Sequence, residues 1–210
     1  MKKTHIIILV AILGIVLVGI VGYFQVVKPE IDNRTVETSA PTPIASQETD
    51  LAFSYPSGVD SLLMIEPPIS STSPSGLKKV YLLADYQEYI EYSNEGSVGT
   101  PPPTISIFAL SYASTTDGGD AEGAGRVSKL QTWAAQNPQF TSWTAKNSEA
   151  EVVEVDGATA IRYTAAGTYQ QEVYVVLYVG DMYVFAGQFE EEGGVMQTRF
   201  ADLVSSVIFN

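Results

Sequence analysis

A long apolar run lies close to the start of the chain. Residues 6–24 contain no charged residue and no proline. Because an α-helix rises about 1.5 Å per residue, this run can cross the ~30 Å hydrocarbon core of a bilayer. Met1, Lys2 and Lys3 precede it, as in an export signal, but no Ala-x-Ala-like cleavage site follows it. We therefore expect an uncleaved signal anchor over residues 6–27.

The orientation of this anchor follows from the charges on its two sides. Lys2 and Lys3 flank one end, and Lys28 and Arg34 flank the other, so the lysine and arginine count is balanced. The terminal amine and the very short tail favour residues 1–5 in the cytoplasm. The sequence thus predicts a single-pass protein of the cell membrane, with its C-terminal domain outside the cytoplasm.

Residues 28–50 follow the anchor and contain few large apolar side chains. They are rich in Thr, Ser, Pro and Glu, which is the composition of a flexible linker. A coil of this kind holds the next domain a few nanometres from the membrane at most, since its span grows as about 5–6 Å times the square root of its length.

From Leu51 onward, short apolar runs alternate with turn residues, which is typical of β-strands. Val127, Leu130 and Ala134 share one stripe of a predicted helix that Pro138 ends. Residues 85–92 fit a helix or a strand about equally well. The pattern predicts strands near 53–55, 62–66, 80–84 and 104–113, and a helix over 126–137.

The last third of the chain predicts two β-hairpins and a closing helix. One hairpin joins 151–155 to 158–165 through Asp156-Gly157, a dipeptide that hairpin turns favour. The other joins 172–179 to 182–189 through Gly180-Asp181. The final helix covers 195–207 and has one apolar face. Sequential hairpins rule against a parallel sheet, so residues 51–210 form one α+β domain with an antiparallel sheet packed by helices.

The charge of the chain excludes one class of function. Its formal net charge is −13 at pH 7, and residues 51–210 alone carry −12. Proteins that bind nucleic acid need a basic patch to displace phosphate counterions, and this sequence supplies none. The charge suits either a solvated domain or one with a cationic partner.

The domain also lacks the side chains of several common catalytic sites. The chain has no cysteine, and its one histidine, His5, precedes the apolar run. Ser-His-Asp and Cys-His sites and histidine-based metal sites are therefore excluded from the domain. Paired carboxylates remain as candidates for hydrolysis, although no pair stands out in the sequence. We expect that the domain is not an enzyme.

Two groups of residues are candidates for binding. Asp117, Asp120 and Glu122 lie in a glycine-rich segment and offer oxygen ligands for calcium, although their spacing is not that of an EF-hand. The second group, Tyr86, Tyr89 and Tyr92 beside Glu88 and Glu91, predicts an acidic and aromatic surface for a peptide, sugar or cationic group. Packing within the sheet is the simpler explanation for these tyrosines.

Several core and turn residues between Leu51 and Phe209 resemble a known family. They are the opening Phe-Ser-Tyr-Pro from Phe53, the helix with Trp133, the Val-Asp-Gly-x-x-Ala from Val155 to Ala160, a tyrosine-rich strand pair and the ending Phe-x-x-Leu-x-x-Ser-Val-x-Phe from Phe200. This pattern is similar to PsbP-like domains, in the superfamily shared by the photosystem II extrinsic protein PsbP and the nuclear-transport factor Mog1. The resemblance implies an α/β/α sandwich, as in bacterial membrane-anchored proteins with one such domain. It implies no catalytic residue in this chain.

These observations support three hypotheses for function. The first is a non-enzymatic binding or accessory domain held outside the cytoplasm by the anchor. The second is a structural or assembly factor that contacts a complex of the cell envelope. The third is an envelope hydrolase that uses carboxylates. The first two require a protein partner in the envelope, besides the membrane contact of residues 6–27.

Overall fold

A computed structural model of the chain describes residues 42–45, 49–57, 62–70, 73–94, 96–97, 99–112 and 124–210. The predicted anchor and the three proposed calcium ligands lie outside these ranges. Within them, no helix is long and apolar enough to cross a membrane. The anchor therefore stays a prediction from the sequence.

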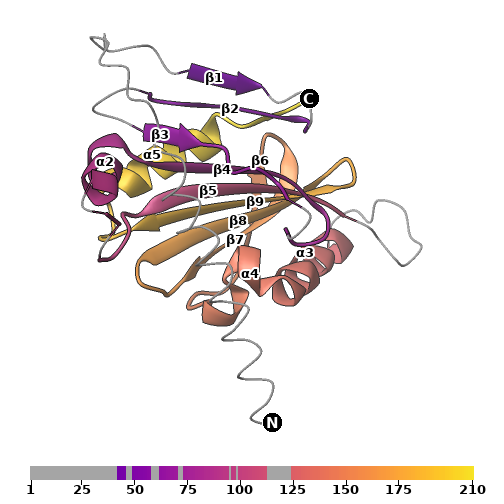
Figure 1. The fold of residues 1–210 in the computed structure, drawn as a ribbon. Coiled ribbons are helices and arrows are strands. Elements are labelled where there is room, and N and C mark those ends of the chain that lie inside the picture. The colour runs from indigo at the N-terminus through magenta and orange to yellow at the C-terminus, as the bar shows by residue number, and fades with distance from the viewer. Residues whose placement is uncertain are drawn as a thin grey trace.

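A seven-stranded antiparallel sheet forms the centre of the described residues, in the order β3-β4-β5-β9-β8-β7-β6 (Figure 1). Its strands are β3 (Leu62–Ile65), β4 (Leu77–Asp85), β5 (Thr104–Ser111), β6 (Glu151–Val155), β7 (Ala158–Ala165), β8 (Gln170–Tyr178) and β9 (Asp181–Phe189). In β9 every residue except Gln188 is buried. A strand that is buried on both faces needs a layer on each side of the sheet, and the domain provides both.

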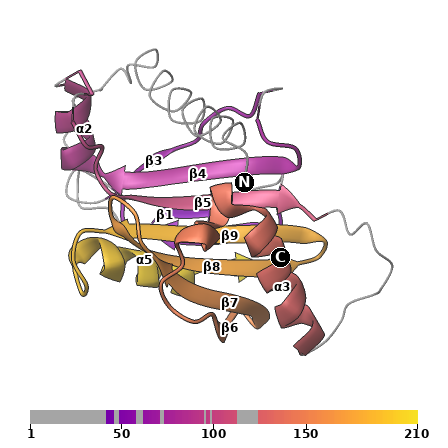
Figure 2. The ribbon, with the colours of Figure 1, turned by 90° about the horizontal axis from the view of Figure 1, so that it is seen from below.

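The two layers differ in kind. Helices α3 (Ala124–Gln136) and α4 (Pro138–Thr141) and the 3-10 helix η1 (Trp143–Ala145) cover one face of the sheet (Figure 2). The other face carries α5 (Val195–Ser205) and a small sheet of three strands, β1 (Thr42–Ala45), β2 (Leu51–Tyr55) and β10 (Ile208–Phe209). The α+β class, the antiparallel sheet and its packing by helices are thus confirmed.

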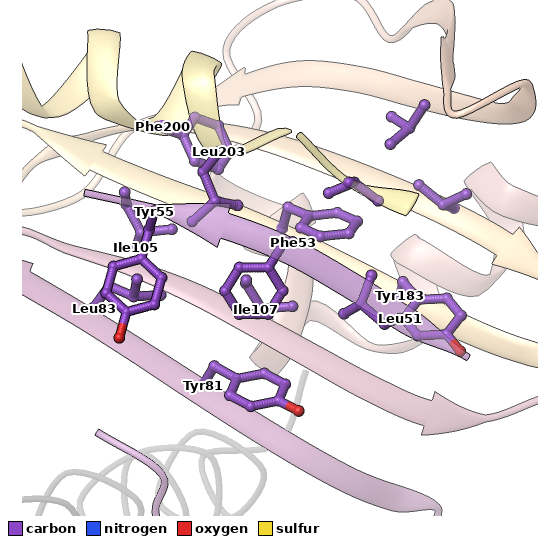
Figure 3. Packing of buried hydrophobic residues seen from close by; sticks show 14 of the residues in the cluster. Leu51, Phe53, Tyr55, Tyr81, Leu83, Ile105, Ile107, Tyr183, Phe200 and Leu203 are labelled. Carbon is purple, nitrogen blue, oxygen red and sulfur yellow. The ribbon is translucent and has the colours of Figure 1, made fainter. Parts of the chain in front are cut away.

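Aromatic side chains fill the core between the large sheet and the layer of α5 and β2 (Figure 3). Phe53 of β2 packs edge-on against Tyr81 of β4, with ring centroids 5.3 Å apart. Phe200 of α5 lies directly over Gly187 of β9, where a Cβ atom would come within 2.4 Å of the ring. The flat surface that glycine leaves on β9 is therefore what lets α5 approach the sheet.

The core on the opposite face contains buried polar groups that are satisfied. The Tyr163 hydroxyl donates a hydrogen bond of 2.6 Å to the carbonyl oxygen of Thr141. The Thr141 hydroxyl in turn donates to the carbonyl oxygen of Ala134 at 2.8 Å. Since buried polar groups cost free energy unless they are paired, these bonds fix α4 between α3 and the sheet.

The structure revises the sequence predictions in some segments and assigns the one that they left open. Residues 42–45, inside the predicted linker, pair with β2 as β1; Pro43 is compatible with this position because β1 is an edge strand. The ambiguous segment is a helix, α2 (Tyr86–Asn94). Asp85 caps it, because its Oδ1 accepts hydrogen bonds from the backbone N–H groups of Gln87 at 3.0 Å and Glu88 at 3.3 Å.

The second hairpin turns one residue earlier than predicted, at Val179-Gly180, and Asp181 begins β9. Both turn residues have positive φ angles, 41° at Val179 and 79° at Gly180. A β-branched residue in this region is strained, and Val179 gains little from packing because it is 72% exposed. Asp181 is held by Lys78, whose Nζ lies 2.7 Å from both carboxylate oxygens.

We expect Val179→Asn to stabilise the protein by about 1 kcal/mol, because Asn-Gly is the preferred dipeptide for this turn and asparagine tolerates positive φ. The free energy of unfolding in urea measures the gain. Val152→Asn is the control, since Val152 is also exposed but has an ordinary strand conformation; it should give no gain. Equal effects in both variants would contradict the strain at Val179.

Candidate functional site

Carboxylates from two distant parts of the chain meet at one end of the sheet. Asp85 ends β4 and Glu88 lies in the first turn of α2. Glu190 directly follows β9 and starts the loop to α5, which also contains Glu191 and Glu192. We call Asp85, Glu88, Glu91, Glu190, Glu191 and Glu192 the acidic end.

An ion pair joins the two parts of the acidic end. Arg199 of α5 places its Nη1 atom 2.7 Å from Oδ2 of Asp85, and both side chains are largely buried. This contact fixes α2 relative to α5. Glu88, Glu91 and Glu190 are exposed to solvent. The fold therefore compensates Asp85 and leaves the other carboxylates as a negative surface.

The electrostatics of Glu88 reflect this crowding. Partial burial raises the pKa of Glu88, and the negative charges of Asp85 and Glu190 raise it further, whereas Arg199 acts in the opposite direction. Glu91 also contributes to the increase. Burial together with Glu190 and Glu88 raises the pKa of Tyr169, whose hydroxyl donates a 2.9 Å hydrogen bond to the carbonyl oxygen of Pro101. Tyr169 thus adds an aromatic ring to the acidic end.

We expect Glu88→Gln to stabilise the protein at neutral pH by a few tenths of a kcal/mol, a small effect because the side chain is exposed. The raised pKa means that the folded state binds this proton more tightly than the unfolded chain. Ionised Glu88 therefore opposes folding, and the penalty is lost as the pH falls through the pKa of the folded state. The melting temperature in low salt should rise at pH 7, and this gain should shrink in 1 M salt. A gain of the same size in low and in high salt would contradict the repulsion.

The three tyrosines of the predicted binding surface differ in how deeply they are buried. All lie on α2, but Tyr89 is only 7% exposed and belongs to the core. Tyr86 and Tyr92 are half-buried. The sequence thus identified α2 as a candidate but could not show which of its tyrosines reach the surface. A binding role for this group stays a prediction.

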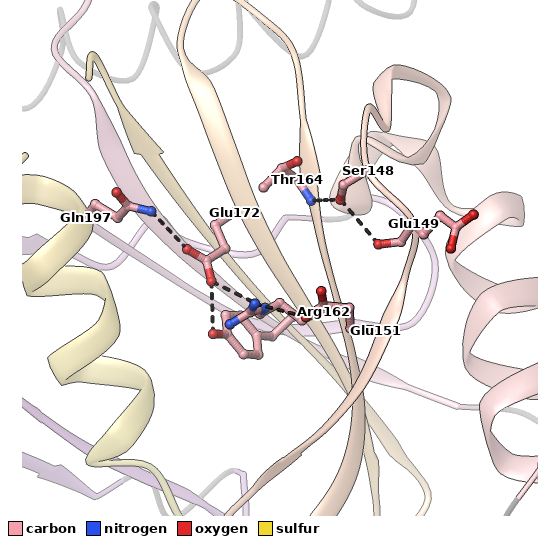
Figure 4. Close-up of polar contacts among 8 residues, drawn as sticks. Ser148, Glu149, Glu151, Arg162, Thr164, Glu172 and Gln197 are labelled. Carbon is pink, nitrogen blue, oxygen red and sulfur yellow. Dashed lines mark hydrogen bonds and ion pairs between the residues drawn. The ribbon is translucent and has the colours of Figure 1, made fainter. Parts of the chain in front are cut away.

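A second polar cluster lies across β6, β7 and β8 (Figure 4). Arg162 of β7 contacts Glu151 at 2.9 Å and Glu172 at 3.8 Å. The Tyr174 hydroxyl donates to Glu172 at 3.0 Å, and the Gln197 amide donates to it at 3.4 Å. One guanidinium thus joins two carboxylates, an arrangement typical of an ion-pair network between strands and a helix.

The opposite end of the sheet has a different character. It carries Lys78, paired with Asp181, and Arg126, which donates to the carbonyl oxygen of Leu177. Asp50 and Asp156 also lie near this end, beside Tyr183 and Phe209, so positive and negative side chains are mixed there. Negative charge collects at the end that holds α2 and the loop from β9 to α5.

The calcium hypothesis falls on residues that the structure does not describe. Asp117, Asp120 and Glu122 lie between Tyr112 and Ala124, outside the described ranges. Within those ranges no three His, Cys, Asp or Glu side chains are grouped to hold a metal ion. Calcium binding stays a prediction from the sequence.

Sequence reasoning also missed part of the acidic end. Tyr169, Arg199 and the Glu190–Glu192 run are far from α2 in the chain. The sequence does show three consecutive glutamates after a predicted hairpin. It cannot show that they lie beside α2, because their position depends on the order of strands in the sheet.

The comparisons with known proteins concern the fold. No family model matches the chain, and no curated protein matches it. The solution structure of the cyanobacterial PsbP protein CyanoP from Synechocystis sp. PCC 6803 is similar, with a TM-score of 0.50 at 16% sequence identity over 87% of this chain and 100% of CyanoP. A crystal structure from Bacteroides thetaiotaomicron VPI-5482 has a TM-score of 0.43 at 9% identity, and the match covers 80% of this chain and 48% of that one. The match to CyanoP concerns the fold alone: this chain has a PsbP-like fold, as the resemblance in its sequence predicts.

Proposed function

We propose that this chain is a non-enzymatic accessory domain that works by contact with a cationic protein, which it recognises through the acidic end. The observation that carries the proposal is the convergence of α2 with the loop from β9 to α5, because it concentrates negative charge on one end of an acidic domain. A partner with a basic surface gains electrostatic attraction there, and attraction of this kind increases association rates and selects partners.

The proposal includes the predicted membrane anchor. Thr42 of β1 lies opposite Tyr55 of β2, and Leu62, soon after Tyr55, lies opposite Asp85. The chain thus enters the described domain on the side of the acidic end. As a coil, the part of the predicted linker that precedes β1, residues 28–41, would span roughly 19–22 Å. The acidic end would then lie within reach of a partner in the same membrane, which also suits an assembly factor of an envelope complex.

A carboxylate-dependent hydrolase is the alternative, and it has less support. Glu88, whose pKa is raised, lies on an exposed helix turn. Glu151 and Glu172 share Arg162 between them, whereas glycosidase carboxylates flank the bond that they cleave. Neither arrangement provides an acid and a base on opposite sides of a substrate.

Binding of a basic probe tests the proposal. The full-length protein in a neutral detergent is titrated with a fluorescent poly-lysine peptide at 50 mM and 150 mM salt. We expect the Glu190→Gln and Glu191→Gln double variant to bind more weakly by about tenfold, and the Asp50→Asn and Asp202→Asn variant to bind nearly as the wild type does. All four residues are exposed, so both variants lose the same charge. Equal losses would mean that net charge alone drives binding and would overturn the acidic end as a specific surface.

A further inference from the structure

The outer edge of the large sheet is open at β6. This strand is last in the strand order and lies at the margin of the sheet in Figure 2. Its five residues pair with β7 without a bulge. Val152 is 59% exposed, and Glu151 and Glu154 are also exposed.

The register shows which backbone groups of β6 point outward. Val155 and Ala158 close a two-residue turn whose residues, Asp156 and Gly157, have φ angles of 49° and 73°. In such a hairpin the closing pair is hydrogen-bonded, and bonded and non-bonded pairs then alternate along the strands. The backbone N–H and C=O groups of Val152 and Glu154 therefore face away from β7.

Contacts farther along β7 agree with this register. The carbonyl oxygen of Thr164 accepts a hydrogen bond of 3.0 Å from the backbone N–H of Asn147. The backbone N–H of Thr164 donates to Oγ of Ser148 at 2.8 Å (Figure 4). The backbone groups of Thr164 therefore point toward the β6 side of β7. The backbone groups of Arg162, which lies opposite Glu151, point the same way. Among the described residues, no hydrogen bond reaches the outward backbone groups of Val152 or Glu154.

The other edge strands among the described residues are protected in ways that β6 is not. Pro67 and Pro68 follow β3 closely, and Pro43 lies inside β1. Strand β10 has two residues. Prolines, very short strands and charged side chains are usual means of limiting strand addition. Strand β6 has no proline and five residues, and its exposed glutamates repel only a segment of the same charge.

The charges along β6 indicate which kind of segment can bind to this edge. Glu149, Glu151 and Glu154 are exposed at this edge, and Arg162, which pairs with Glu151, lies on the inner strand. A second copy of the chain would bring the same glutamates close to those of β6, and like charges on neighbouring strands are destabilising. An extended segment with lysine or arginine places opposite charges there.

We propose that the β6 edge binds an extended, lysine- or arginine-bearing segment of another protein as an added β-strand. This surface differs from the acidic end in its position, and it uses backbone hydrogen bonds as well as charge. The pairing with the outward groups of Val152 and Glu154 supplies affinity, and the glutamates supply selectivity.

Amide hydrogen exchange with a synthetic peptide tests this proposal. The probe is an eight-residue peptide of alternating Lys and Val, added to the full-length protein in neutral detergent. We expect exchange at the Val152 and Glu154 amides to slow by about tenfold or more at saturation, because both gain hydrogen bonds. A peptide with Glu in place of Lys should not bind.

A proline variant separates backbone pairing from charge. Val152→Pro removes an outward N–H and should weaken peptide binding by about tenfold while the pairing with β7 persists. The matched control is Val195→Pro, because Val195 is 66% exposed and occupies the first position of α5, where proline is tolerated. If Val152→Pro does not fold, amide hydrogen exchange at Val152 and Glu154 in the wild-type protein tests the proposal by itself.

Four results would overturn the proposal. They are no binding of the peptide at about 1 mM, binding without slower exchange at Val152 and Glu154, equal affinities for the two proline variants, or loss of binding in the Glu190→Gln and Glu191→Gln variant alone. A wild-type dimer that Val152→Pro abolishes would instead make a second copy the occupant. The acidic end is tested separately, by the effect of the Glu190→Gln and Glu191→Gln variant on binding of the poly-lysine peptide.

Discussion

Substitution of Gly187 by alanine should destabilise the domain by about 3 kcal/mol and lower its melting temperature by about 10 °C. The added Cβ would lie 2.4–2.8 Å from three ring carbons of Phe200, well inside van der Waals contact. Neither side can yield easily. Gly187 is paired with both Ile105 and Glu172 in the middle of the sheet, and Phe200 is 1% exposed.

A double-mutant cycle tests this explanation through the free energies of unfolding. Phe200→Ala alone leaves a cavity and should cost about 3–5 kcal/mol. If the ring is what the new methyl group strikes, Gly187→Ala should cost much less in the Phe200→Ala background than in the wild type. Additive effects would show that glycine is needed at this position for another reason.

Phe209→Ala should cost about 3 kcal/mol, although Phe209 is the penultimate residue of the chain. Its ring stacks on Tyr178 with centroids 4.7 Å apart and contacts Tyr183 at 5.1 Å. Its backbone N–H donates to Oδ2 of Asp156 at 2.7 Å, which ties the end of the chain to the turn between β6 and β7. Phe209 is 7% exposed, so its removal opens the core between the two sheets.

The neighbouring residue provides the control for Phe209. Ile208 lies in the same two-residue strand but is 53% exposed. Ile208→Ala should therefore change the free energy of unfolding by at most about 0.5 kcal/mol. Similar losses in both variants, measured by denaturation in urea, would mean that β10 acts through its backbone pairing and not through the buried ring.

The elements with clear periodicity could be predicted from the sequence. The hairpin with Asp156-Gly157 and the closing helix from Val195 lie where the pattern predicts them. The turn at Val179 could not be predicted, because sequence rules assign a β-branched residue to the strand. Lys78 holds Asp181 at the start of β9, and tertiary contacts of this kind are absent from a local pattern.

The acidic end depends on long-range structure in the same way. Glu88 and Glu190 are neighbours because β4, β5 and β9 lie side by side, so that α2 and the loop after β9 meet at one end of the sheet. The sequence predicted an acidic and aromatic group on residues 86–92. Packing was the simpler explanation for these tyrosines, but the sequence could not predict that Tyr89 is the one that is buried, or that Tyr169 joins the group from the other side.

Photo-crosslinking in the native membrane tests the central claim most directly. A photoreactive amino acid is placed at position 191, in the acidic end, or at position 179, at the exposed turn between β8 and β9. We expect one reproducible protein partner from position 191, joined through a lysine- or arginine-rich segment, and none from position 179. Crosslinks from position 179 alone, or equal crosslinks from both positions, would contradict recognition through the acidic end.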